Sequence, residues 1–296
     1  MKQNMRQKHM QAYLFLSPFL VFITVLYILP AILTVIMAFT SLDSAFIWKF
    51  NGINNFRKIL MDPNTPIIAW NTIKYVGITI FLTVVLDLFF AIMTTYFIRD
   101  ERKGNIFKGI LMIPMITPAV VYSVLWIWLL EATPNGLANK VYMALGGSEP
   151  LNWIAQYPFV IIIAATLLTS IAYGTTVFSS AVKSIPENQF RAARVDGAGE
   201  WEIVRNIILP NLRFHITFIA LWETLGLLTN YVTIMLITNG GPGVQTEVWA
   251  LSAYHKAFSD SQYGYGAAIS LVLIVVVMVL MLVIGAVMHH QEKSRS

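Results

Sequence analysis

Six long apolar stretches, separated by polar segments, constrain this chain more than any other feature of its sequence. A helix needs about 20 predominantly apolar residues to cross the hydrocarbon core of a bilayer, and each stretch reaches that length with a few interruptions. The stretches run near Tyr13 to Phe39, Ile67 to Ile98, Phe107 to Leu130, Phe159 to Val182, Phe214 to Ile237 and Tyr263 to Met288. We therefore expect an all-α membrane protein with six transmembrane helices.

The composition independently supports a membrane class. Hydrophobic residues make up 57% of the 296 residues and charged residues only 12%, whereas soluble proteins average about 25% charged. The net charge of +5 is explained by basic loops beside a membrane and does not require a nucleic-acid partner.

The distribution of lysine and arginine predicts the orientation. With six spans both termini lie on one side, and 14 of the 20 basic residues are cytosolic if that side is the cytosol. Loops rich in lysine and arginine stay in the cytosol. We therefore expect cytosolic tails at residues 1–12 and 289–296 around a six-helix domain at 13–288, in the cell membrane. Because the first apolar run is long and lacks a small-residue cleavage site, we interpret it as an uncleaved anchor.

Several kinds of chemistry are disfavoured by the sequence. The chain has no cysteine and only five scattered histidines, so thiolate metal sites are excluded and we expect no bound metal. A phosphate-binding loop of the GxxxxGK[ST] type is absent, as are an HExxH motif and a Ser-His set. We expect a chain that is not an enzyme and binds no cofactor itself, so that energy for any transport comes from a partner.

Residues 184–210 form a polar segment between the fourth and fifth apolar stretches. Ser184 and Glu187 have the spacing of a capping box, and Pro186 suits a first helical turn, so a short helix should start here. Asp196-Gly197-Ala198-Gly199 should end it, and a second helix from Trp201 should stop at Pro210. Small residues between the helices allow another protein's backbone to approach closely. The alternative is an ordinary basic loop between two spans.

This segment resembles the "EAA" coupling loop of the membrane-spanning subunits of binding-protein-dependent ABC importers. Four motifs match at the family's spacing, namely Ile185-Pro186, Ala192-Ala193, Asp196-Gly197-Ala198 and Leu209-Pro210. The resemblance implies that the loop, residues 184–213, lies in the cytosol between the fourth and fifth helices and docks on a separate ATPase. The implied docking residues are Arg191, Ala192, Ala193, Asp196, Gly197, Ala198, Glu200, Leu209 and Pro210.

One docking position departs from the family pattern. Arg191 stands where the family usually has glutamate, which reverses the charge at that contact. Either the ATPase carries a compensating acid, or a second membrane subunit provides the stronger half of the coupling.

Other motifs are similar to those of the sugar-importer branch of the same family, which includes maltose and oligosaccharide permeases. They extend from the first span to the loop after the fifth, at Leu16–Leu20, Gly52–Phe56, Asn71-Thr72 and Thr238–Pro242. The resemblance implies a permease that imports a carbohydrate, such as an oligosaccharide, a sugar derivative or a glycerol-phosphate-like solute. It also implies the partners: an ABC ATPase dimer that binds ATP and Mg²⁺, a second homologous permease, and an extracytoplasmic solute-binding protein.

Polar residues at membrane depth mark a candidate substrate pathway, because such groups usually face a bundle interior or a water-filled cavity. Glu223 is followed by the polar and aromatic residues Asn230 and Tyr231, and rings and amides are groups that bind sugars. By its distance from the coupling loop, Tyr173 corresponds to a sugar-contacting tyrosine of the family. Packing and interhelical hydrogen bonding are the alternatives for each residue, and we favour a structural role for Asp87 in the second span.

A secondary transporter or channel driven by an ion gradient is the main alternative function. That class needs an inverted internal repeat or several membrane acids as ion ligands. The sequence shows no convincing repeat and only two deeply placed acids, Asp87 and Glu223.

Overall fold

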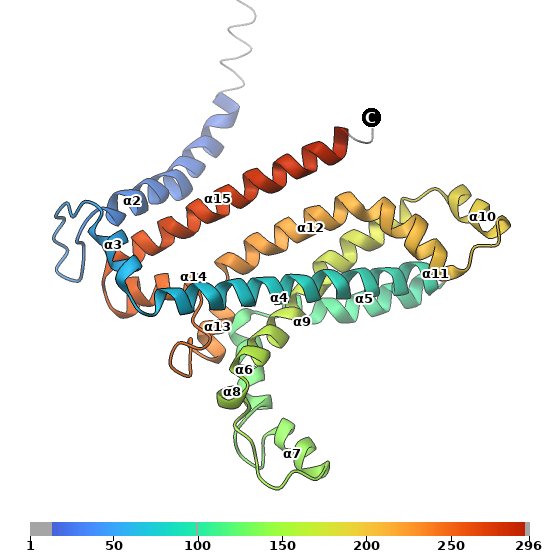
Figure 1. The fold of residues 1–296 in the computed structure, drawn as a ribbon, viewed down its shortest axis with the longest axis horizontal. Helices are drawn as coiled ribbons and strands as arrows, with labels where there is room; N and C mark the ends of the chain where they lie inside the picture. The colour runs from blue at the N-terminus through green and yellow to red at the C-terminus, as the bar shows by residue number, and fades with distance from the viewer. Residues whose placement is uncertain (1–13, 99, 294–296) are drawn as a thin grey trace, which may run out of the picture. The chain divides into compact units, whose positions relative to one another are not determined.

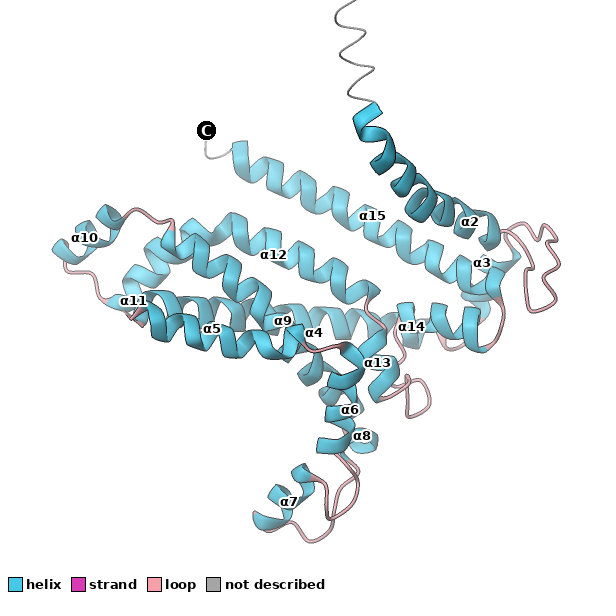
Figure 2. Cartoon of the chain, turned by 180° about the vertical axis from the view of Figure 1, so that it is seen from behind, coloured by secondary structure: helices cyan, strands magenta, loops and turns pink. Residues whose placement is uncertain are grey.

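The structure is a computed structural model that describes residues 14–98 and 100–293, with side-chain exposure described up to residue 286. Figure 2 shows helices and connecting loops in this part of the chain, and the only β-pairing described is an isolated bridge between Thr40 and Phe50. The predicted N-terminal tail, 1–12, lies outside the described residues, as do residues 294–296 of the predicted C-terminal tail, 289–296, whose residues 289–293 continue the last helix. The all-α prediction is confirmed for the part of the chain that is described.

The chain divides into two compact units. The first contains residues 14–62 and Ser252–Ile274. Its helices are the run Leu14–Ala38, which includes the wide turn η1 (Thr24–Ile28) and α2 (Leu29–Ala38), then α3 (Asn54–Met61), η4 (His255–Ser259) and the first part of α15 (Tyr263–Lys293).

Asn55 organises the first unit at the end of its first long helix. This buried side chain donates hydrogen bonds from Nδ2 to the carbonyl oxygens of Ala38 and Thr40, at 2.9 and 2.8 Å. These are carbonyls that a helix end leaves without an intrahelical partner. The Gly52–Phe56 motif, to which Asn55 belongs, therefore has a structural function in this chain.

The second unit contains Pro63–Leu251 and residues 275–293. Its core is formed by four long helices that pack against one another, α4, α5, α9 and α12 (Figure 1). The helices of this unit are α4 (Thr65–Ile92), the wide turn η2 (Met93–Phe97), α5 (Glu101–Ile116), α6 (Ala119–Leu129), α7 (Leu137–Ala144), α8 (Trp153–Gln156), α9 (Pro158–Lys183), α10 (Glu187–Val195), α11 (Glu200–Ile203), the wide turn η3 (Val204–Ile208), α12 (Leu209–Thr229), α13 (Val232–Ile237), the first half of α14 (Trp249–Tyr254) and the later part of α15.

Four described helices are long and apolar enough to cross a membrane, Leu14–Ala38, Thr65–Phe97, Pro158–Lys183 and Tyr263–Ala286. The predicted third stretch is not one straight helix, since α5 and α6 meet at a 96° bend. Pro118 accounts for the bend, because a proline lacks the N–H that would continue the helix and keeps the preceding residue, Thr117, extended.

The predicted fifth stretch is also interrupted. Asn230 adopts an extended conformation at the end of α12, and α13 starts two residues later. The Thr229 hydroxyl donates to the carbonyls of Leu225 and Gly226. Such local side-chain bonds to the backbone compete with helix continuation. The sequence periodicity did not indicate this break.

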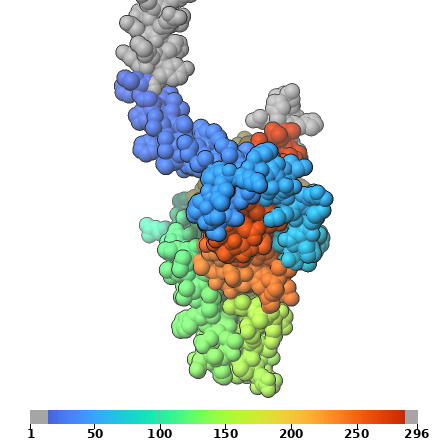
Figure 3. Space-filling model, turned by 90° about the vertical axis from the view of Figure 1, so that its left-hand side faces the viewer, coloured from blue at the N-terminus to red at the C-terminus, as the bar shows by residue number. Residues whose placement is uncertain are grey.

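The segment between α6 and α9 is an ordered hairpin rather than a plain loop, and it forms a separate projection in Figure 3, in green. Its centre is Asn139, which is fully buried. Asn139 Nδ2 donates to the carbonyls of Glu131, Thr133 and Leu151, at 2.9 to 3.2 Å. Its Oδ1 accepts from the Leu151 N–H and from Trp153 Nε1, at 3.0 and 2.8 Å.

We predict that Asn139→Leu disorders this hairpin while the four-helix core stays folded. Leucine has similar size but removes five hydrogen bonds that join separate parts of the hairpin, and a typical hydrogen bond contributes about 0.5–1.5 kcal/mol. Limited proteolysis of the purified protein should then show rapid cleavage between residues 131 and 157. Asn135→Ala, an exposed change in the same hairpin, is the control. Equal resistance of the Asn139→Leu variant would refute the organising role.

Candidate functional site

The segment that resembles a coupling loop begins directly after α9, and its start differs from the prediction. Ser184 is not an N-cap, because it ends α9 and its hydroxyl donates to the Ala181 carbonyl at 2.7 Å. Pro186 takes the N-cap position and α10 starts at Glu187. The predicted capping box is therefore wrong, although the predicted helix is present. The proline provides the reason, since its fixed φ suits a helix start without a side-chain cap.

The glycine turn after α10 is confirmed in detail. Gly197 has φ = +81°, a conformation that residues with a Cβ adopt only with strain. The Ala198 N–H donates to the Ala193 carbonyl at 2.9 Å and the Gly197 N–H to the Arg194 carbonyl at 3.2 Å. These two bonds form a Schellman motif, which satisfies the last carbonyls of α10.

The second helix begins as expected but continues past its predicted end. The Gly199 N–H donates to the Glu202 side chain at 3.0 Å as α11 starts. The chain then passes through the wide turn η3 into α12, so Pro210 lies in the first turn of α12 instead of ending a helix. In η3 the Leu209 N–H bonds back to Val204. A wide turn of this type interrupts the regular i→i−4 hydrogen bonds of the helix. It does so next to Pro210, which has no N–H to donate to such a bond.

Buried apolar side chains hold this segment against the ends of three long helices. The cluster joins α4, α9, η3 and α12, and Leu209 and Phe190 pack on its edge. Its buried members are Ile92, Ala181, Val182, Ile185, Val204, Ile208 and Leu212. The segment is too short to form a hydrophobic core of its own, and its apolar side chains are buried against those of the helix bundle.

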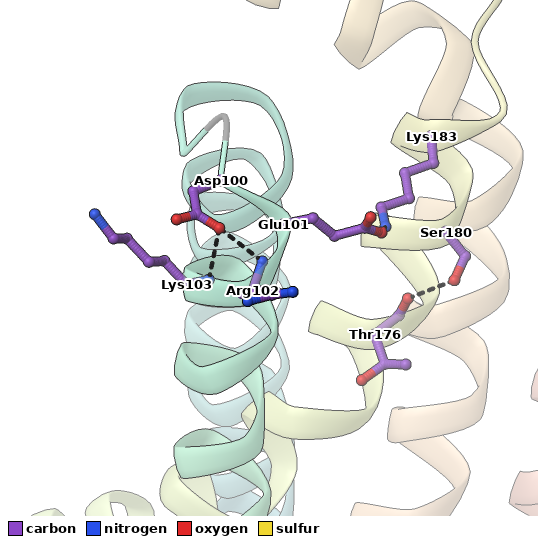
Figure 4. A network of polar contacts seen from close by, with 7 residues as sticks. All are labelled: Asp100, Glu101, Arg102, Lys103, Thr176, Ser180 and Lys183. Carbon is purple, nitrogen blue, oxygen red and sulfur yellow. Dashed lines mark hydrogen bonds and ion pairs between the residues drawn. The ribbon is translucent and has the colours of Figure 1, made fainter.

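Charged contacts add to this attachment. Tyr96, in η2 at the end of α4, hydrogen-bonds the Glu200 carboxylate through its hydroxyl. Arg194 lies 3.9 Å from Glu200 and donates to the Tyr96 hydroxyl at 3.4 Å. Nearby, Lys183 at the end of α9 pairs with Glu101 at the start of α5, while Asp100 caps α5 through the N–H groups of Arg102 and Lys103 (Figure 4).

The opposite face of the segment is open. Val195 is 87% exposed and Trp201 is 73% exposed. Arg191 forms an exposed ion pair with Glu187 one turn away, at 2.9 Å. Of the other predicted docking residues, those exposed or partly exposed are Ala192, Ala193, Asp196, Gly197, Ala198 and Glu200. Leu209 and Pro210 belong to α12 and are only partly exposed.

At membrane depth, Asp87 has the structural role that the sequence favoured. It is fully buried, and its Oδ1 accepts from both the backbone N–H and the hydroxyl of Thr175, each at 2.9 Å. A side chain at Gly174 would overlap the Asp87 carboxylate. The carboxylate therefore joins α4 to α9 at a point of close approach.

The predicted pathway residues are distributed along α9 and α12. The Tyr173 ring lies 6.3 Å from the ring of Trp222, between centroids. Glu223 follows Trp222 and is partly buried. Asn230 and Tyr231 lie at the break between α12 and α13, about 12 Å further along the helix at 1.5 Å per residue. The structure thus brings Tyr173 to Trp222 and leaves Asn230 and Tyr231 two turns away.

Two sequence motifs that are far apart in the chain meet in the second unit. Asn71 Nδ2 donates to the carbonyls of Val244 and Glu247, at 2.8 and 3.2 Å. The Trp249 N–H donates to the Thr72 hydroxyl at 2.8 Å. The Asn71-Thr72 pair therefore fixes the loop that follows Thr238–Pro242.

No group of three or more histidine, aspartate or glutamate side chains that could hold a metal ion is found within residues 14–98 and 100–293. Sequence reasoning missed three features of this region. Tyr96 had no motif to mark it, Gly174 was one small residue within an apolar stretch, and the partner of Asn71 lay more than 170 residues away.

A family model described as "Binding-protein-dependent transport system inner membrane component" matches residues 87–296. A probable ABC transporter permease of Pyrococcus horikoshii is 27% identical over 87% of this chain and 88% of its own length. A trehalose/maltose transport system permease of Thermococcus litoralis is 27% identical over 87% of this chain and 86% of its own length.

The fold is similar to that of a chain in a bacterial alginate ABC transporter solved in complex with an alginate pentasaccharide-bound periplasmic protein. The TM-score is 0.82 at 18% identity, over 94% of this chain and 93% of the other.

Proposed function

Since the chain belongs to the family of binding-protein-dependent transport system inner membrane components, we propose that it is the permease subunit of an ABC importer that brings a carbohydrate into the cell. It is a multi-pass membrane protein and a transport component. The carbohydrate assignment is supported by the trehalose/maltose permease relative and by the alginate transporter with a similar fold. The cargo proposed is an oligosaccharide, a sugar derivative or a glycerol-phosphate-like solute.

The open face of the α10–α11 segment carries the proposal of ATPase coupling. Val195 and Trp201 are large apolar side chains exposed on either side of the Gly197 turn, and a protein docked over them would remove their apolar area from water. The Gly197 turn leaves space beside its backbone, since nothing lies within 4 Å of a Cβ built there. We propose that an ABC ATPase dimer, which binds ATP and Mg²⁺, docks on this face.

Arg191 gives this docking face a specific electrostatic requirement. It is paired with Glu187 only through an exposed contact, and exposed ion pairs of this type contribute little, typically less than about 1 kcal/mol. Arg191 is therefore available to a partner. An acidic residue on the ATPase, or stronger docking by the second permease, would compensate for the missing glutamate.

The proposed topology has six membrane-spanning segments with both termini in the cytosol. In it the bent pair α5–α6 counts as one span and α12 as another. The six-helix domain covers residues 13–288, and the coupling loop covers 184–213. The N-terminal helix Leu14–Ala38 has almost entirely exposed apolar side chains, which suits contact with lipid or with a second, homologous permease. A solute-binding protein would deliver substrate on the outer side.

The mechanism proposed is alternating access. ATP binding closes the paired ATPase subunits, their motion displaces the α10–α11 segment, and the attached long helices move as rigid bodies. The substrate pathway would be lined by Tyr173, Glu223, Asn230 and Tyr231. Trp222, whose ring is tilted against that of Tyr173, adds an aromatic face of the type on which sugars stack.

If Trp222 contacts the sugar, Trp222→Ala should raise the half-saturating substrate concentration for transport. Loss of an aromatic contact costs about 0.5–1.5 kcal/mol beyond area burial, which corresponds to roughly a 2- to 12-fold increase. Transport by reconstituted complex at varied sugar concentration measures this change. Trp128→Ala, at an exposed tryptophan of α6, is the control, and identical saturation curves for both variants would exclude Trp222 from the pathway.

Isolation of the complex tests the proposed function. The chain, expressed from its native locus with an affinity tag and purified in mild detergent, should bring with it an ATPase carrying a GxxxxGK[ST] loop and a second permease. A gradient-driven secondary transporter is the alternative. It would purify as an oligomer of this chain alone and transport solute without ATP, and that result would contradict the proposal.

A further inference from the structure

Tyr96 lies at the end of the second unit's bundle, where the α10–α11 segment is attached. It belongs to η2, the wide turn that ends α4. Its hydroxyl contacts Glu200 and Arg194. Arg194 lies in the last turn of α10 and Glu200 is the first residue of α11. One hydroxyl therefore touches both helices, one on each side of the Gly197 turn.

The backbone around Tyr96 is held firmly. A Cβ at Gly104 in α5 would overlap the carbonyl oxygen of Thr94, so α5 and η2 are in direct backbone contact. The Tyr96 ring lies 5.7 Å from the ring of Phe190 in α10 and 5.1 Å from that of Phe97, between centroids. The ring contacts and the backbone contact together restrict the position of the Tyr96 hydroxyl.

The polar contacts of Tyr96 are better suited to positioning than to stability. The side chains of Arg194 and Glu200 are 48% and 51% exposed, and exposed ion pairs contribute little to folding. The buried apolar cluster around Ile208 already attaches the segment. The polar contacts instead connect α10 and α11 to the end of α4 through one hydroxyl.

We propose that Tyr96 is a positioning residue that transmits movement of the α10–α11 segment into the α4 helix, through its hydroxyl contacts with Arg194 and Glu200. The inference rests on the proposed function, because it assumes that an ATPase moves this segment. It adds a residue outside the 184–213 loop to the coupling apparatus. Without the hydroxyl, the segment still docks but pivots about the Gly197 turn without moving α4 to the same extent.

The test uses Tyr96→Phe in the complete complex, reconstituted in liposomes with its ATPase, second permease and loaded binding protein. The variant keeps the ring contacts with Phe190 and Phe97 and removes only the hydroxyl. The number of ATP molecules hydrolysed per solute transported should rise at least about fivefold, the lower end of typical allosteric coupling. The amount of ATPase that co-purifies should not change, since the docking face is intact.

Tyr75→Phe is the matched control. It also removes a tyrosine hydroxyl from α4, one that is bonded to Thr166 at 3.1 Å in the buried interior. Because this hydroxyl has only a structural role, we expect Tyr75→Phe to lower the midpoint of thermal unfolding and to leave the ATP-to-solute ratio unchanged. Glu200→Gln provides a second variant, which keeps an acceptor for the Tyr96 hydroxyl and loses the charge facing Arg194. It should raise the ratio less than Tyr96→Phe does.

An unchanged ATP-to-solute ratio in Tyr96→Phe would overturn the inference. A rise of the same size in Tyr75→Phe would also overturn it, because the effect would then follow general loosening of α4. Gly197→Leu separates this failure from failure of the proposed function. If Gly197→Leu loses transport and stimulated ATP hydrolysis while Tyr96→Phe leaves the ATP-to-solute ratio unchanged, only the role of Tyr96 is wrong. Normal transport and stimulation in Gly197→Leu would instead remove the coupling role of the whole segment.

Discussion

Replacing Gly197 by leucine should abolish most transport and most stimulated ATP hydrolysis while the complex still assembles. Two features of the turn give this result. Gly197 has φ = +81°, where a residue with a Cβ is strained by about 1–2 kcal/mol. Nothing in this chain lies within 4 Å of the new Cβ, so the side chain extends into the space where we place the ATPase. A loss of about 5- to 150-fold, the usual range of coupling between sites, is expected.

Controls separate backbone strain from steric obstruction in this experiment. Gly197→Asn introduces a residue that tolerates the left-handed conformation and should retain more activity than Gly197→Leu. Gly146→Leu places a similar side chain at another open, positive-φ glycine, in the α7 hairpin. It should leave the ATPase bound and its stimulation close to that of the unchanged protein. Normal transport by Gly197→Leu would disprove the coupling role of this segment.

The Gly174→Ala change should destabilise the four-helix core more than any other glycine-to-alanine change in α4 or α9. A methyl group there would overlap the Asp87 carboxylate, which cannot turn aside because Thr175 holds its Oδ1 in a fully buried site. Overpacking of this kind costs typically about 1–3 kcal/mol. The midpoint of thermal unfolding of purified protein in detergent, with the yield of folded protein, measures the loss.

A second substitution tests the cause of that loss. Asp87→Ala removes the carboxylate that the new methyl group would strike, so the double variant should be more stable than the sum of the two single effects predicts. Residues in direct contact show such non-additivity. Gly77→Ala in α4 has open space at its Cβ and should be neutral or slightly stabilising, because alanine favours helix more than glycine does. Strict additivity of the Gly174 and Asp87 changes would refute direct contact.

The features that depend on local periodicity and turn chemistry could be predicted from the sequence. The helical class, four of the six apolar stretches, the helix ending at Val195 and the glycine turn at Gly197 agree with the described structure. Each depends on residues that are neighbours along the chain. Recognition of the family also succeeded, because it rested on several motifs in a fixed order.

The features that depend on packing between distant segments could not be predicted. Pro118 could be identified in the sequence as a site where a helix can end, but the 96° angle between α5 and α6 also depends on the segments that pack around them. Pro210 was interpreted as a helix end because the wide turn η3 that precedes it has no sequence signature. Asn139 and Tyr96 act through contacts with residues up to 104 positions away. A polar residue by itself does not reveal such partners.

ATP hydrolysis by the purified complex in lipid nanodiscs tests the central claim most directly. The complex would be assayed with its binding protein across a panel of oligosaccharides and polyol phosphates. The importer account predicts that one ligand of the panel, bound to its binding protein, stimulates hydrolysis above the rate with unloaded binding protein, and that Gly197→Leu removes this stimulation. Absence of any co-purifying ATPase, together with solute uptake driven by an ion gradient alone, would contradict the account.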